Sequence, residues 1–186
     1  MKRIGVDLDG VVVRPPLGLN ITISRRLDLP VLAADGTIEG TDPRLRSLVR
    51  SWLEYGRYAL RRPMPGVCEA FAQLAQVREV HVISARSHAG LASTERWLEK
   101  HGLLTHVNAI HLKPHGVRPP YFKTWTLQRL GIPEHVDDDG ATAHYLASNA
   151  GITVYLCDWP GNRGLPYPEK VHVVPDLAAV ATRLSF

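Results

Sequence analysis

The sequence has few cysteines and no long apolar run. Only Cys68 and Cys157 occur, far apart and outside any C-x-x-C pair, so we expect neither a disulfide framework nor a cysteine-based zinc site. This cysteine usage indicates a reducing, cytoplasmic setting. Asp7 and Asp9 interrupt the apolar N-terminal stretch, and no later run approaches the ~18 apolar residues of a membrane span. We therefore expect neither a signal peptide nor a membrane partner.

The sequence also lacks the common nucleotide-binding glycine motifs. Neither G-x-x-x-x-G-K-[ST] nor G-x-G-x-x-G is present, which argues against a P-loop NTPase or a dinucleotide-binding protein. His111 and His115 are four residues apart, but Pro114 between them disfavours a zinc-binding helix. Lys and Arg outnumber Asp and Glu by 22 to 18, a net charge of +4. That balance suits an anionic ligand without singling out nucleic acid.

The length and the hydrophobic pattern predict an α/β protein. A chain of 186 residues with 45% hydrophobic residues can bury the core of one domain that carries a modest insertion. Apolar β-branched runs alternate with helical patterns, which is typical of a Rossmann-like parallel sheet. We expect strands over residues 3–8, 79–84, 107–112, 135–137, 153–157 and 171–174, and helices over 65–77, 90–101, 122–130, 141–150 and 176–184.

Residues 15–62 break this alternation and are expected to form a small, mainly helical cap, inserted into a core made of residues 1–14 and 63–186. Thr41-Asp42-Pro43 predicts a helix start, and Ala34-Asp35-Gly36-Thr37 predicts the turn of a small hairpin. Tyr55 and Tyr58 are candidates to stack on a base or a sugar. The arginines of this segment either face an anionic substrate or form a solvated surface: Arg57, Arg61 and Arg62.

Two carboxylates follow the first expected strand. Asp7 and Asp9 are two residues apart, so on a strand they would leave its carboxyl end on the same side. That edge of a parallel sheet is where α/β proteins build their sites. Close carboxylates repel unless a cation lies between them or one of them is protonated. The alternative is that one of them caps a turn and the other is solvated.

A second acidic cluster follows the short strand at His135. Asp137, Asp138 and Asp139 are consecutive and precede a helix. A hard cation such as Mg²⁺, which takes oxygen ligands, would relieve the repulsion among them. A solvated turn with a helix-capping aspartate is the alternative reading. Because both clusters lie at the same edge of the sheet, we favour a metal site.

Other residues are candidates for binding a phosphate group. Ser84 ends an expected strand, and Ala85 and Arg86 follow, so that a hydroxyl, a backbone N–H and a guanidinium could converge on an anion. Lys123 stands near the start of a helix, whose positive end already favours anions. Lys113, which follows another strand, is a competing candidate.

Taken in order, these residues resemble the four motifs of the haloacid dehalogenase (HAD) superfamily of phosphatases: Asp7-Leu8-Asp9-Gly10, Ser84, Lys123 and Asp137-Asp138. The segments Val82-Ile83-Ser84-Ala85-Arg86 and Asp158-Trp159-Pro160-Gly161-Asn162-Arg163 are similar to the cytosolic 5′(3′)-deoxyribonucleotidase branch. Ser87 stands where that branch usually has Pro, and Asp-Asp-Asp replaces its Glu-Asp-Ser. The direct metal ligand in this motif is expected to be Asp138, with Asp137 or Asp139 supporting it.

The resemblance implies a Mg²⁺-dependent phosphatase. By it, Asp7 is the nucleophile, Asp9 is the acid and base, and Ser84 and Lys123 bind the phosphoryl oxygens. Mg²⁺ would be held by Asp7, the backbone carbonyl of Asp9 and the acidic pair Asp137 and Asp138.

The implied substrate is a small phosphorylated metabolite, preferably a (deoxy)nucleoside monophosphate. It would contact Ser84, Ala85, Arg86, Lys123, Tyr55 and Tyr58. The alternatives are a sugar-phosphate phosphatase, a polynucleotide-end phosphatase, and a non-catalytic protein that binds an anion or a partner. A homodimer is among the expected assemblies.

Overall fold

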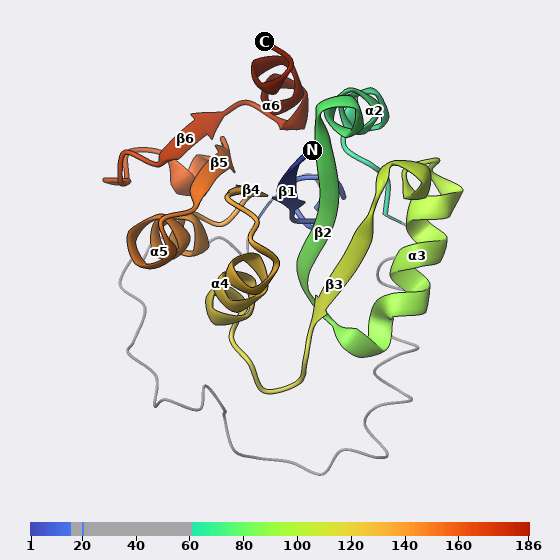
Figure 1. Ribbon diagram of the computed structural model, residues 1–186, viewed down its shortest axis with the longest axis horizontal. Helices are drawn as coiled ribbons and strands as arrows, with labels where there is room; N and C mark the ends of the chain where they lie inside the picture. The colour runs from blue at the N-terminus through green and yellow to red at the C-terminus, as the bar shows by residue number, and fades with distance from the viewer. Residues whose placement is uncertain (16–19, 21–60) are drawn as a thin grey trace.

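A computed structural model of the chain describes residues 1–15, 20 and 61–186 (Figure 1). The helix and the hairpin expected within the cap lie outside the described residues, and so do Tyr55 and Tyr58. The division of the chain into a core and a cap at residues 15–62 therefore stays a prediction.

Six parallel strands form one sheet in the order β3-β2-β1-β4-β5-β6. They are β1 (Lys2–Val6), β2 (Arg78–Ser87), β3 (Ala109–Lys113), β4 (Glu134–Asp137), β5 (Thr153–Cys157) and β6 (Val171–Val174). The chain builds outward from β1 to one edge and then returns to the other side of β1 with β4. The strand order therefore reverses between β1 and β4, and such a switch point opens a crevice at the carboxyl ends of the strands.

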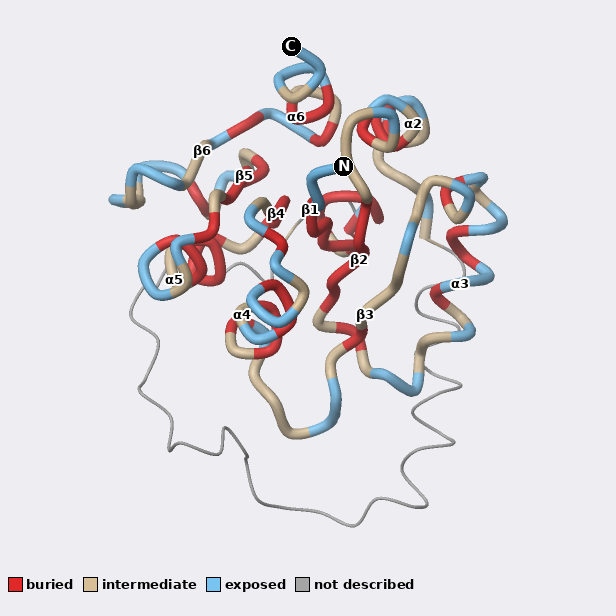
Figure 2. Tube along the Cα trace, in the orientation of Figure 1, coloured by how far each residue is buried: buried red, intermediate tan, exposed pale blue. Residues whose placement is uncertain are grey.

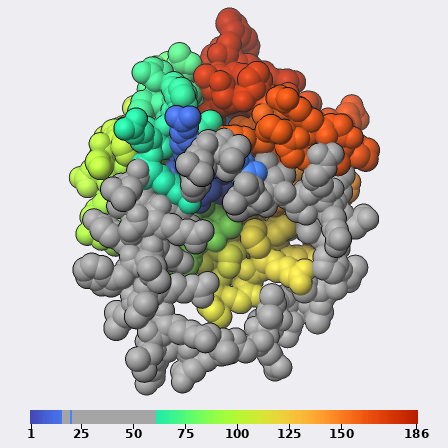
Figure 3. Space-filling view, turned by 180° about the vertical axis from the view of Figure 1, so that it is seen from behind, coloured from blue at the N-terminus to red at the C-terminus, as the bar shows by residue number. Residues whose placement is uncertain are grey.

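Helices cover both faces of the sheet (Figure 1). They are α2 (Val67–Val77), α3 (Leu91–Lys100), α4 (Pro119–Leu130), α5 (Gly140–Ala150) and α6 (Leu177–Leu184), with short 3₁₀ turns η2 (His88–Gly90), η3 (Leu104–His106) and η4 (Pro160–Asn162). Apolar residues of α2, α3 and α6 form one buried cluster with the sheet, and those of α4 and α5 form another. Helix α2 packs against α6, as views from opposite sides show (Figure 1 and Figure 3).

Most residues of the central strands β1 and β4 are buried (Figure 2). In β2, Val82 belongs to the α2 cluster while its neighbour Ile83 belongs to the α4 cluster, because successive side chains of a strand point to opposite faces. Both side chains are fully buried, and each such burial contributes about 1.5–3 kcal/mol. This explains why the strands read as continuous apolar runs rather than as an alternating pattern.

The expected α/β class and parallel sheet are confirmed, and β5 and β6 have the predicted bounds. Every other strand and helix differs from its expected bounds at one or both ends, and three of these differences are larger or affect the site. Strand β1 ends at Val6 rather than Leu8, and β2 runs past Ser84 to Ser87 through a register shift. Helix α4 begins at Pro119 rather than Phe122, because proline fits the first helical turn, where its missing N–H has no partner to lose. Among the described residues, no helix is long and apolar enough to cross a membrane.

Candidate active site

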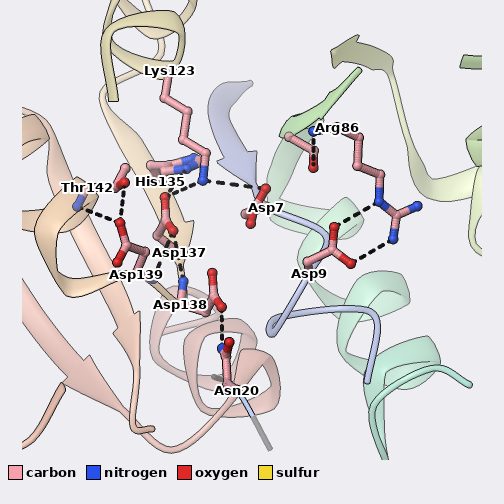
Figure 4. Close-up of polar contacts among 11 residues, drawn as sticks. Asp7, Asp9, Asn20, Arg86, Lys123, His135, Asp137, Asp138, Asp139 and Thr142 are labelled. Carbon is pink, nitrogen blue, oxygen red and sulfur yellow. Dashed lines mark hydrogen bonds and ion pairs between the residues drawn. The ribbon is translucent and has the colours of Figure 1, made fainter. Parts of the chain in front are cut away.

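Polar side chains gather at the switch point between β1 and β4 (Figure 4). Asp7 directly follows β1, and its backbone N–H donates to the carbonyl of Val136 at 2.9 Å, which keeps the two strand ends together. Asp137 ends β4, and Asp138 follows it. Ligand oxygens of Asp7, Asp137 and Asp138 lie within 4.8 Å of one another. The structure thus brings together the two acidic clusters that the sequence analysis placed at this edge.

Asp137 is fully buried and surrounded by donors. Its Oδ2 accepts from Lys123 Nζ at 2.7 Å and lies 3.0 Å from His135 Nε2. Its Oδ1 accepts the backbone N–H groups of Asp138 and Asp139 at 2.9 and 3.1 Å. Burial alone would raise the pKa of Asp137, but Lys123 and His135 outweigh it and hold the pKa well below its usual range. Asp137 is therefore ionised, with both of its oxygens already engaged.

Lys123 reaches the site from the first half of α4, and only 2% of it is exposed. Its ammonium group also forms a longer ion pair of 3.5 Å with Asp7 Oδ1. Burial would lower the pKa of Lys123, but the negative charges of Asp137 and Asp7 more than offset this and raise it above its ordinary value. Lys113, the competing candidate, ends β3 and donates to the carbonyl of Pro114 at 3.3 Å. Of these two lysines, Lys123 is the one within the acidic cluster.

Asp7 is buried with little compensation. Among the residues that the structure describes, Asp7 Oδ1 accepts no hydrogen bond, and its ion pair with Lys123 is long. Burial raises the pKa of Asp7 from 3.8 to about 7, which Lys123 opposes and the neighbouring carboxylates reinforce. A buried carboxylate oxygen without a hydrogen-bond donor is available as a nucleophile or as a ligand for a cation.

Asp138 is 6% exposed and accepts a hydrogen bond from the amide of Asn20 (Figure 4). Burial raises its pKa well above the usual value, and repulsion from Asp7 and Asp137 adds to this. The loop after β1 lies against this carboxylate. Gly10 has a φ of +79°, and a Cβ there would collide with Asp138 Oδ2. Glycine at position 10 therefore allows both the positive φ of the turn and the close approach of the loop to the Asp138 carboxylate.

The charges of this cluster fit a divalent cation. When ionised, Asp7, Asp137 and Asp138 carry three negative charges against one positive charge on Lys123. Asp137 is saturated by donors, so Asp7 and Asp138 are the carboxylates with oxygens to offer. Hard oxygen ligands of this kind suit Mg²⁺, and the raised pKa values show how costly the two charges are without a cation.

Asp9 lies apart from Asp7 and has different partners (Figure 4). Arg86 holds it with a bidentate pair, Nε to Oδ2 at 2.9 Å and Nη2 to Oδ1 at 3.0 Å. Arg61 donates to the same Oδ1 at 2.9 Å. The expectation that Asp7 and Asp9 leave a strand together is wrong, because β1 ends before both residues and the chain turns between them. Arg86, expected to face a phosphate, pairs with Asp9 instead.

Ser84 and Ala85 lie where β2 becomes irregular. Ser84 pairs with Leu112 and Ser87 with Lys113, so two residues of β2 are extra relative to β3. Ser84 is 1% exposed, and its Oγ accepts the backbone N–H of Arg86 at 3.4 Å. The bulge aims the Arg86 side chain at Asp9, and it is a feature that the sequence pattern did not predict.

Asp139 is a helix cap in this structure. Its Oδ2 accepts from the backbone N–H and the hydroxyl of Thr142, at 3.0 and 2.6 Å, at the start of α5. This is the alternative that the sequence analysis left open for one aspartate of the cluster. Of the three consecutive aspartates, Asp137 binds Lys123, Asp138 faces Asp7 and Asp139 caps a helix.

The segment after β5 supports the site. The sequence pointed to this segment only through its resemblance to a known family. The Asn162 amide donates to the carbonyls of Asp138 and Cys157 at 2.8 and 3.0 Å and accepts the Gly140 N–H at 3.2 Å. Trp159 Nε1 donates to the Gly10 carbonyl at 3.0 Å. These bonds tie the loops after β1, β4 and β5 together. His135, two residues before Asp137, was also missed as a polar member of the site.

No family model and no curated protein matches the sequence, but solved structures match the fold. A HAD-superfamily hydrolase of subfamily IA from Geobacter sulfurreducens has a TM-score of 0.57 at 18% identity, covering 98% of this chain and 99% of that one. A protein described as a predicted phosphoglycolate phosphatase from Haemophilus somnus 129PT has a TM-score of 0.59 at 18% identity, with coverage of 98% and 97%.

CbbY from Rhodobacter sphaeroides, solved in complex with phosphate, has a TM-score of 0.61 at 15% identity, covering 97% of this chain and 96% of that one. The chain thus has the α/β fold of HAD-superfamily hydrolases. Sequence identities this low indicate a shared fold, whereas the activity depends on the residues of the site.

Proposed function

We propose that the protein is a Mg²⁺-dependent phosphomonoester hydrolase that works through an aspartyl-phosphate on Asp7. The observation that carries the proposal is the buried pair of Asp7 and Asp138 beside Lys123 at the switch point. A nucleophilic carboxylate, a pair of hard oxygen ligands and a fixed positive charge are what phosphoryl transfer requires from a protein. The fold shared with HAD-superfamily hydrolases supports this reading.

Asp7, Asp138 and the backbone carbonyl of Asp9 would hold the Mg²⁺. When bound, the cation supplies charge neutralisation, so that an anionic carboxylate can approach an anionic phosphate. Asp137, included among the expected ligands, has the different task of fixing Lys123, since its two oxygens accept four hydrogen bonds.

The protein side of the reaction has two steps. In the first, an Asp7 oxygen bonds to phosphorus while the ester P–O bond breaks, and Asp9 gives a proton to the departing alkoxide. In the second, Asp9 takes a proton from water, the water oxygen bonds to phosphorus, and the bond to Asp7 breaks. Lys123 and Ser84 hold the non-reacting phosphoryl oxygens.

Asp9 has to change partners for these steps. Both of its oxygens accept from guanidinium groups, and a carboxylate held in this way cannot also carry a proton to a leaving group. An arriving substrate phosphate offers Arg86 another acceptor of the same bidentate geometry. Arg86 would then serve as the phosphate ligand that the sequence predicted.

We propose a (deoxy)nucleoside monophosphate as the preferred substrate. The resemblance of residues 82–86 and 158–163 to the deoxyribonucleotidase branch supports this choice, and Tyr55 and Tyr58 are proposed to stack on the base. A sugar-phosphate phosphatase is the second candidate, supported by the fold shared with a protein described as a putative β-phosphoglucomutase from Thermotoga maritima. A cytoplasmic setting and a homodimer stay predictions.

The test is a hydrolysis panel of nucleoside monophosphates, sugar phosphates and 3′- or 5′-phosphorylated oligonucleotides, with Mg²⁺ or with EDTA. We expect release of inorganic phosphate only with Mg²⁺, fastest from a nucleoside monophosphate. Preference for a sugar phosphate or an oligonucleotide would overturn the substrate assignment while leaving the reaction class. Failure to hydrolyse any monoester would favour a non-catalytic anion-binding protein.

A further inference from the structure

His135 is a fully buried imidazole in the central strand β4. It alternates with Val136, which belongs to the apolar cluster on the α2 face. His135 therefore points to the opposite face, together with Asp137 two residues later. Burying an imidazole in a strand core costs free energy that an aliphatic side chain would not. A specific contact has to account for its presence.

That contact is the hydrogen bond between His135 Nε2 and Asp137 Oδ2, 3.0 Å long. An ionised carboxylate can only accept a hydrogen bond, so Nε2 must carry a proton and donate it to Oδ2. The same Oδ2 accepts Lys123 Nζ at 2.7 Å. His135 and Lys123 thus share one oxygen atom.

The fold makes room for this imidazole. Gly5 of β1 pairs directly with His135 of β4, and a Cβ at Gly5 would lie 2.6 Å from His135 Nδ1. Any larger residue at position 5 would push the ring away from Asp137. The glycine in β1, the histidine in β4 and the carboxylate at the end of β4 are therefore one packed unit.

We propose that His135 is a positioning residue, which acts through Asp137 to fix the Lys123 ammonium beside Asp7. The backbone N–H groups of Asp138 and Asp139 hold Oδ1, and His135 completes the set at Oδ2. The four donors fix the Asp137 carboxylate in one orientation, and this carboxylate in turn fixes the position of the Lys123 ammonium group. The inference rests on the proposed function for the role of Lys123 at the phosphate, and it assigns to His135 a part that is separate from filling the core.

Three variants separate positioning from packing. His135→Gln keeps an amide N–H near the place of Nε2. His135→Leu fills similar space with no donor, and His135→Asn keeps the amide but is too short to reach Asp137. His81→Leu is the matched control, since His81 is a buried histidine of β2 whose ring contacts His111 on β3, away from the acidic cluster.

The first readout is turnover of the best substrate in the presence of Mg²⁺. By analogy with partners that orient metal ligands, whose loss costs about 10–100-fold, we expect His135→Leu and His135→Asn to lose activity on that scale. His135→Gln should recover most of it, and His81→Leu should match wild type. Equal losses in the Gln and Leu variants would overturn the proposal, because packing alone would then explain them.

The second readout needs no activity. The Lys123 ammonium, buried in its ion pair, should give a slowly exchanging ¹⁵N–¹H signal by NMR in the wild-type protein and in His135→Gln. In His135→Leu and His135→Asn the signal should broaden or disappear. If the signal is unchanged in both, His135 does not position Lys123. An inactive wild type with this NMR pattern intact would reject the proposed function and keep the positioning role. If His135→Leu does not fold, the Gln and Asn pair still decides.

Discussion

Asp137 and Asp138 are consecutive buried aspartates with opposite electrostatic environments. Asp137 accepts hydrogen bonds from a lysine, a histidine and two backbone N–H groups, and its pKa is held well below its usual range. Asp138 faces Asp7 and accepts from Asn20, and its pKa is raised. Burial penalises both charges, so the charge of the neighbouring groups and the hydrogen bonds decide the direction of each pKa shift. The contrast separates a carboxylate whose charge the protein itself compensates from one whose oxygens could bind a cation.

The largest expected effect follows from replacing Asp7. Asp7→Asn should abolish turnover, with a loss of more than about 10³-fold, since an amide cannot form the acyl-phosphate. Circular dichroism should show a folded protein. Asp176→Asn, which changes the cap of the distant helix α6, is the control and should keep wild-type activity. Mg²⁺-dependent hydrolysis by Asp7→Asn at the wild-type rate would remove Asp7 as the nucleophile.

A second prediction compares the stability of two matched variants. Asp137→Asn leaves Lys123 buried without its closest partner, and breaking such a pair costs about 3–5 kcal/mol. Asp138→Asn removes an uncompensated charge and should stabilise the metal-free protein at pH 8. Urea unfolding in EDTA measures both. If the two variants shift stability in the same direction, the contrast between the two aspartates fails.

Asn162 provides a smaller test, directed at the scaffold that holds Asp138. Asn162→Ala strips a partner from the Asp138 carbonyl and from the Gly140 N–H, and each unsatisfied buried group costs about 1–3 kcal/mol. We expect a lower midpoint of urea unfolding and weaker Mg²⁺ binding. Asp158→Asn, in the exposed pair with Arg163, should alter neither. Equal midpoints for Asn162→Ala and wild type would show that the brace is dispensable.

The smallest effect concerns pH. The pKa of Asp7 rises from 3.8 in the unfolded chain to about 7 in the folded protein, so the folded state binds the proton more tightly. The stability that this gives is present below pH 4 and is lost as pH rises through 7. Mg²⁺ must displace that proton at low pH, so it should raise the melting temperature more at pH 8 than at pH 5. An equal rise at both pH values would show that Asp7 is ionised without a cation.

The sequence predicted the sheet well because its strands are buried on both faces, and short apolar runs at regular intervals leave little ambiguity. It also placed Asp7 and the aspartates at the end of β4 at one edge, since parallel strands end together, and it selected Lys123 as a phosphate-binding candidate near a helix start. It could not distribute roles among Asp137, Asp138 and Asp139. That distribution depends on donors far away in the chain, such as Lys123, and on backbone N–H groups whose direction only the folded turn defines.

Two other features depended on details that no pattern encodes. After Ser84, β2 has a bulge, and Arg86 within it binds Asp9. The sequence, interpreted with a regular strand end, instead predicted that the Arg86 guanidinium binds phosphate. The contact between His135 and Asp137 was predictable in principle, because residues two apart on a strand lie on the same face. The pairing of His135 with Gly5, which makes the space, needs the register of β1 and β4.

The most direct test of the central claim is calorimetric titration of Mg²⁺ into wild type and Asp138→Asn at pH 7 in two buffers of different ionisation enthalpy. We expect the wild-type protein to bind Mg²⁺ with release of protons, and Asp138→Asn to show no binding. Wild-type affinity in Asp138→Asn, or binding without proton release, would contradict the claim that Asp7 and Asp138 together bind Mg²⁺.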